Sequence, residues 1–97
     1  MEQIAFVARL RPECKGDYIE AHQNFSSQLR EKYLAAGVHQ ILLFLCGEQL
    51  FMYVEADDYQ KACASLASDE LDQVWQKQVG PMKDPDFHPL TEIFRLR

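Results

Sequence analysis

A tyrosine and a histidine lie one helical turn apart near the start of the chain. Tyr18 and His22, within the stretch DYIEAHQNFS, are four residues apart, so a helix would present a phenol and an imidazole side by side. Histidine changes charge near neutral pH and can both accept and donate a proton, so the pair predicts acid/base chemistry. The alternative is a core histidine bonded to a backbone carbonyl, and the spacing alone favours that alternative.

Other side chains that could carry chemistry have structural explanations as well. Trp75 is either a core anchor or one wall of a sugar pocket, since an indole face packs against the C–H face of a pyranose. Asp57 and Asp58 precede a predicted helix and are typical of helix caps. The KDPD segment at 83–86 is typical of a solvated turn, although a loop of this kind can also close over a pocket.

Composition and charge argue against several classes of protein. The 97-residue chain has a formal net charge of −5, which disfavours binding to nucleic acid or to an anionic membrane. No apolar run approaches the roughly 20 residues of a membrane-spanning helix, and the N-terminus carries no targeting signal. Neither the three cysteines nor the three histidines are spaced as a disulfide framework or a metal site. We therefore expect a cytoplasmic protein without a metal.

Helical spacing and capping residues predict three helices. Apolar residues at intervals of three and four predict one long helix over 13–36, which Gly37 ends. Two shorter helices follow, one opening at the DD pair at 57–58 and one at Asp69, and Gly80 and Pro81 end the second.

Alternating apolar residues predict four strands, and the whole chain reads as a single domain over residues 1–97. The strands are expected at 3–10, 39–46, 49–56 and 91–97, with a turn at 47–48 and an irregular loop at 82–89. This order predicts an α+β fold, a ferredoxin-like four-stranded antiparallel sheet with helices on one face.

The second face of that sheet is also apolar. In the strand at 39–46, Ile41, Leu43 and Leu45 alternate with Leu42, Phe44 and Cys46, whereas a sheet covered on one side should show polar residues on the other. We therefore expect a second copy of the chain to cover this face and form a homodimer, a dimeric α+β barrel.

Short motifs along the chain share their order and spacing with one family. They are AFV at 5–7, Tyr18 with His22, AAGVH at 35–39, VE at 54–55, Trp75 and EIFRL at 92–96. With these motifs the chain resembles the L-rhamnose mutarotase family from end to end. The resemblance implies a dimeric isomerase that interconverts the α and β anomers of a deoxy-hexose without a cofactor. It also implies that His22 donates and accepts the proton and that Tyr18 lines the sugar site.

The chain departs from the family pattern in the implied pocket. The family has a WPEL-like stretch where this chain has SSQL at 26–29, a tyrosine where it has Ile41, and paired tryptophans where it has Val74 and Trp75. If Ile41 points into the site, it can pack against a sugar methyl group. The resemblance thus implies Trp75, Ile41 and Val74 as sugar-binding residues, with the sugar open between L-rhamnose, L-fucose and related deoxy-hexoses.

Two other classes of function remain open at this point. The same fold serves small cofactor-free or haem-degrading monooxygenases, in which a pocket histidine near a tryptophan suits a planar aromatic ligand. The chain could also be a non-catalytic ligand-binding or interaction dimer with His22 in its core. A coloured purified protein would favour the first of these classes.

Overall fold

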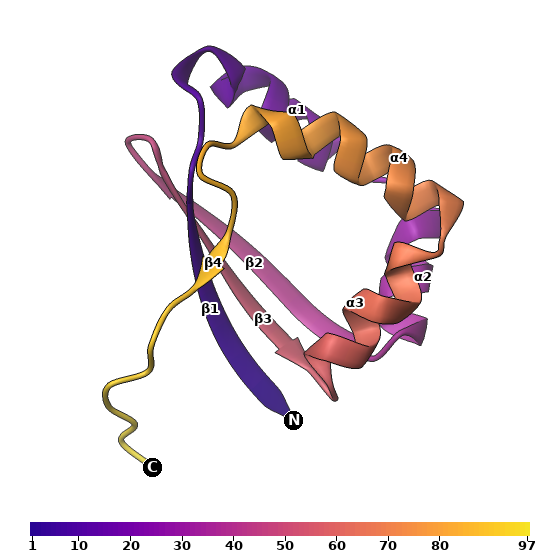
Figure 1. Cartoon of the computed structure of the whole chain (residues 1–97), viewed down its shortest axis with the longest axis vertical. Coiled ribbons are helices and arrows are strands. Elements are labelled where there is room, and N and C mark those ends of the chain that lie inside the picture. Colours follow the sequence, from indigo (N-terminus) through magenta and orange to yellow (C-terminus); the bar gives the residue numbers. More distant parts are fainter.

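The computed structural model describes all 97 residues and contains a four-stranded antiparallel sheet with its helices on one side (Figure 1). The strand order is β2-β3-β1-β4, which is that of the predicted ferredoxin-like fold. The strands are β1 (Glu2–Arg9), β2 (Val38–Cys46), β3 (Gln49–Ala56) and β4 (His88–Pro89). The helices are α1 (Lys15–Gln23), α2 (Ser27–Ala35), α3 (Tyr59–Ala67) and α4 (Glu70–Val79), with short 3-10 turns at Pro12–Cys14 and Gly80–Met82.

The prediction of a single helix over 13–36 is wrong, because the chain breaks between α1 and α2. Ser26 has an extended backbone, and its hydroxyl accepts a hydrogen bond from the backbone N–H of Leu29 at 3.3 Å. A serine in this position caps a new helix, since its side chain satisfies one of the N–H groups that the first turn leaves free. The apolar spacing of the sequence runs on through the three intervening residues, so the spacing alone gives no sign of the break.

The predicted C-terminal strand is also wrong. Residues 91–97 form no ladder with the sheet, and Ile93, Phe94 and Leu96 are almost fully exposed. The fourth strand is instead the two-residue β4, within the segment expected to be a loop, and it pairs with Phe6 and Val7 of β1. Proline has no backbone N–H to donate. Pro89 is tolerated because β4 is an edge strand, whose outer side has no neighbouring strand to bond.

The predicted turn and cap positions are confirmed. Gly37 and Gly47 have φ angles of 97° and 62°, in the left-handed region that favours glycine. Asp58 accepts a hydrogen bond from the N–H of Lys61 at the start of α3, and Asp69 accepts one from Leu71 at the start of α4.

The core lies between the sheet and the helices in two clusters. The first holds Val54 and Ala56 of β3 against α3, and the second holds Leu10, beside β1, against Tyr18 of α1. Leu10 and Val54 are completely buried. The cluster around Leu10 includes Tyr18 and packs against Trp75, two residues that the sequence indicated as site residues. No helix of the protein is both long and apolar enough to cross a membrane.

Candidate active site

Tyr18 and His22 lie side by side on α1, with their ring centroids 4.4 Å apart. Tyr18 is buried in the core cluster of Leu10, while His22 is only partly buried. The Nδ1–H group of His22 donates a hydrogen bond of 2.8 Å to the backbone carbonyl of Tyr18, one turn back. This contact fixes the ring and its tautomer, so Nε2 carries the free lone pair. The carbonyl bond expected of a core histidine is therefore present, and it leaves the other nitrogen available.

The surroundings of the pair keep His22 neutral and Tyr18 protonated near neutral pH. Burial lowers the pKa of His22, the Tyr18 carbonyl partly offsets this, and the positive charge of Lys83 lowers it further. Burial raises the pKa of the Tyr18 phenol, and the negative charge of Asp86 raises it again. The site therefore offers a proton acceptor at His22 next to a hydroxyl donor at Tyr18.

A row of aromatic side chains continues from His22 across the helices. The ring of His22 lies 4.9 Å from that of Trp75 on α4, which lies 4.9 Å from Phe25. Phe25 in turn lies 6.0 Å from Tyr33 on α2. All three contacts are edge-to-face, an arrangement that the aromatic quadrupole favours. Trp75 is thus held against the imidazole, as expected of a wall of the site.

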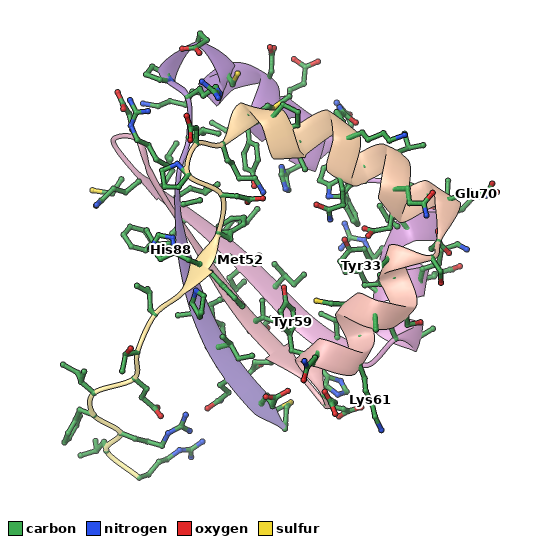
Figure 2. The ribbon with its side chains drawn as sticks, viewed as in Figure 1. Tyr33, Met52, Tyr59, Lys61, Glu70 and His88 are labelled. Carbon is green, nitrogen blue, oxygen red and sulfur yellow. The ribbon has the colours of Figure 1, made fainter.

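Two polar contacts fix α4, and with it Trp75, against α2. The Tyr33 hydroxyl donates a 2.5 Å hydrogen bond to the buried carboxylate of Asp72, and Lys32 forms a 2.5 Å ion pair with Asp69. Burial and the bond to Asp72 raise the pKa of Tyr33, so its phenol remains a donor. Figure 2 shows Tyr33 and Tyr59 projecting into the space between the helices and the sheet. The bond between Tyr33 and Asp72 could not be predicted from the sequence, because the two residues are 39 positions apart in the chain.

A cavity of about 300 Å³ opens beside the pair, between α1 and the β2–β3 hairpin. Tyr18 and His22 form its polar side, and its apolar side includes Leu43, Leu45 and Leu50. This volume falls at the lower end of the range for small-molecule sites, about 300–1,000 Å³. The volume of this cavity therefore suits a ligand the size of one monosaccharide.

The other two residues implied by the resemblance lie further from His22. Ile41 pairs with Val54 in the sheet register, so it lies on the helix-facing side, but it lines neither the cavity beside His22 nor the groove between α1 and α4. Val74 is 65 % exposed and, together with Trp75, lines a separate groove of about 520 Å³ between α1 and α4. The structure therefore brings Trp75 to the histidine and does not bring Val74 there.

The sequence missed the contribution of the loop at 83–87. Lys83 is almost completely buried, and its ammonium group forms a 2.9 Å ion pair with Asp86. Backbone hydrogen bonds tie this loop to β1, from Asp84 N–H to the Arg9 carbonyl at 2.8 Å and from Arg9 N–H to the Pro85 carbonyl at 3.0 Å. The loop is thus anchored to β1 and buries Lys83, while Asp84, Pro85 and Asp86 are exposed, as expected of a solvated turn. No three His, Cys, Asp or Glu side chains converge as a metal-binding group.

The chain is similar to known proteins over nearly its whole length. The family model described as L-rhamnose mutarotase matches residues 3–96. An L-rhamnose mutarotase of Opitutus terrae is 34% identical over 104 residues, covering 99% of each chain. One of Pectobacterium carotovorum is 30% identical over 96 residues, covering 95% of this chain and 91% of its own. The crystal structure of L-rhamnose mutarotase from Formosa agariphila superposes with a TM-score of 0.82 over the full length of both chains, at 22% identity.

The family model spans nearly the whole chain, and both sequence relatives reach 30% identity or more over almost their full length. The solved structure has the same fold. The resemblance seen in the short motifs is therefore confirmed, and the chain belongs to the L-rhamnose mutarotase family of isomerases.

Proposed function

We propose that this protein is a cofactor-independent mutarotase, which interconverts the α and β anomers of a deoxy-hexose such as L-rhamnose or L-fucose. The observation that carries the proposal is the free Nε2 of His22, held by the Nδ1 contact with the Tyr18 carbonyl beside the Tyr18 phenol. Membership of the family favours this activity over a monooxygenase or a non-catalytic dimer.

The reaction moves one proton from the anomeric oxygen O1 to the ring oxygen O5. Nε2 of His22 removes the O1 proton as the C1–O5 bond breaks, and the resulting imidazolium returns that proton to O5, giving the open-chain aldehyde. The Tyr18 hydroxyl donates a hydrogen bond that orients the ring oxygen. Rotation about the C1–C2 bond turns the other carbonyl face toward the hydroxyl, and the same steps in reverse close the second anomer.

The walls of the site suit a deoxy-sugar. Trp75 offers an aromatic surface next to the imidazole, and Leu43 and Leu45 offer aliphatic contacts to a sugar methyl group. Ile41 lies on the same side of the sheet and would extend that apolar wall.

The proposal is tested by saturation-transfer proton NMR on equilibrated L-rhamnose and L-fucose. With the protein present, we expect saturation of one anomeric signal to pass to the other, well above the rate in buffer. A panel of further 6-deoxy-hexoses and hexoses would follow. Absence of transfer with every sugar would overturn the proposed activity.

The pH dependence of the exchange rate follows from the lowered pKa of His22. Because burial and Lys83 favour the neutral ring, His22 remains a competent base below the ordinary imidazole pKa of about 6.5. We expect the acid limb of kcat/KM to have its midpoint below that value, and the rate to be constant from there to pH 8. A midpoint above 6.5, measured from saturation-transfer rates between pH 4.5 and 8, would contradict the assignment of His22 as the base.

We also propose a homodimer formed through the outer face of the sheet. Cross-strand pairing aligns Phe44, Phe51 and Val7 in one row and Leu42 with Tyr53 in the next. In Figure 2, His88 of β4 projects on this side, away from the helices. Phe44 is 58 % exposed, and the apolar rows are bounded by polar contacts such as the Arg9–Glu48 ion pair. An apolar centre with a polar rim is typical of a subunit interface.

A further inference from the structure

The anchored loop at 83–87 presents one carboxylate with a free oxygen. Oδ1 of Asp86 accepts hydrogen bonds from the Lys83 ammonium at 2.9 Å and from the backbone N–H of Phe87 at 2.6 Å. No protein donor contacts Oδ2, and the side chain is 65 % exposed. One oxygen therefore fixes the group, and the other is available to a ligand.

Lys83 is unusual among the lysines because only 5 % of its side chain is exposed. Removing an ammonium group from water is costly unless a partner compensates for the lost hydration. Two partners do so here, the carboxylate of Asp86 and the ring of Phe87, whose centroid lies 4.4 Å from Nζ. The ion pair, together with the backbone bonds to β1, fixes the position of Asp86 before any ligand binds.

The loop packs on the core cluster that holds Tyr18: Lys83 forms a β-bridge with Leu10, which lines the cavity with Tyr18 and His22, and Phe87 packs against the same cluster. The charge of Asp86 acts on the phenol of Tyr18, and the charge of Lys83 acts on the ring of His22. Neither the Tyr18 hydroxyl nor Nε2 of His22 has a hydrogen-bonding partner in the protein. The loop that carries the free carboxylate oxygen therefore packs on the cluster next to the unpaired phenol and imidazole nitrogen. A molecule with several neighbouring hydroxyl groups would satisfy all three.

We propose that Asp86 is a sugar-binding residue of this site, whose Oδ2 accepts a hydrogen bond from a ring hydroxyl, and that Lys83 is the positioning residue that holds it. This inference rests on the proposed mutarotase function and extends its binding site to the loop before β4. Partial burial works against ionisation of Asp86, but the bonds from Lys83 and Phe87 outweigh it and lower the net pKa. The acceptor is thus a carboxylate, and its bond to a hydroxyl is charge-assisted.

Methyl α-L-rhamnoside separates binding from turnover, because its blocked anomeric centre cannot open. We expect Asp86→Ala to bind this glycoside about ten- to a hundredfold more weakly than the wild type, in titrations followed by protein NMR shifts. On free L-rhamnose the same variant should raise KM by a similar factor while kcat changes little. Asp84→Ala is the matched control, since Asp84 lies in the same loop, is 66 % exposed and pairs only with Arg11.

Lys83 is tested by a pair of variants that differ in charge. Lys83→Met keeps the apolar stem and removes the ammonium group, and Asp86 can then turn toward water because it is exposed. We expect a KM increase approaching that of Asp86→Ala and a higher midpoint in the NMR titration of His22. Lys83→Arg restores the charge and should recover most of the affinity. If Lys83 mattered only for folding, Lys83→Met would not shift the titration midpoint of His22, and restoring the charge with Lys83→Arg would not recover the affinity.

The outcomes separate this proposal from the function on which it rests. Glycoside binding by Asp86→Ala equal to that of the Asp84→Ala control, with normal wild-type exchange, would overturn the role of Asp86 alone. Equal affinity of Lys83→Met and wild type would overturn the positioning role. A wild-type protein that neither binds the glycoside nor exchanges anomers of any sugar would overturn both proposals together.

Discussion

Replacing His22 by glutamine is expected to reduce the anomer exchange rate by about a hundred- to ten-thousandfold, the usual contribution of a positioned acid/base group. The glutamine amide can still donate to the Tyr18 carbonyl, so the contact at 2.8 Å has a substitute. It cannot take up a proton near neutral pH. Because His22 is only partly buried, the folded structure should persist. Saturation-transfer NMR gives the rate, and circular dichroism confirms that the variant is folded.

His39→Gln provides the matched control for this substitution. His39 lies on β2, bonds to the carboxylate of Asp57 at 2.7 Å and has a half-exposed side chain, far from Tyr18 in the fold. We expect it to exchange anomers at the wild-type rate. If His22→Gln retained that rate as well, the imidazole would be a packing residue only, and the proton transfer would have to be assigned elsewhere.

The fold was predictable from the sequence to the extent that its signals are local. The alternation of the first three strands, the glycine at position 47 and the aspartate caps depend on neighbouring residues, and each of these predictions is confirmed. The break after α1 carried a local signal too, the serine pair at 26–27, but the apolar spacing continued in phase across it. The prediction of a strand at 91–97 was wrong for another reason. Alternation at 91–97 predicts a strand, yet a strand needs a neighbour, and no neighbour can be read from the segment itself.

The difference between local and long-range signals also explains which contacts of the site could be predicted from the sequence. Tyr18 and His22 are four residues apart on one helix, so their contact follows from helical geometry. The contact of His22 with Trp75 joins distant segments, and only the folded chain brings them together. A lysine in a proline-containing loop gives no sign that it will be buried. Its burial depends on Asp86 and Phe87.

Introducing a charge into the outer face of the sheet is expected to dissociate the proposed homodimer. Phe44 lies on the edge strand β2, at one end of the row that continues with Phe51 and Val7, and is the most exposed of the large apolar residues of β2. In a two-fold interface, Phe44→Glu would bury two carboxylates without partners, which costs several kcal/mol. We expect the dimer dissociation constant to rise by at least about a hundredfold, in sedimentation experiments over a range of protein concentrations.

Leu34→Glu is the control for the general effect of an exposed leucine or phenylalanine becoming charged. Leu34 is 56 % exposed, close to the 58 % of Phe44, but it lies on α2, on the helical side of the sheet. The interface proposed here does not include it, so Leu34→Glu should sediment as the wild type does. Dissociation by both variants would indicate a loss of folding rather than a broken interface. A wild-type protein that sediments as a monomer at every concentration would overturn the proposed homodimer, because its apolar rows would then remain exposed to water.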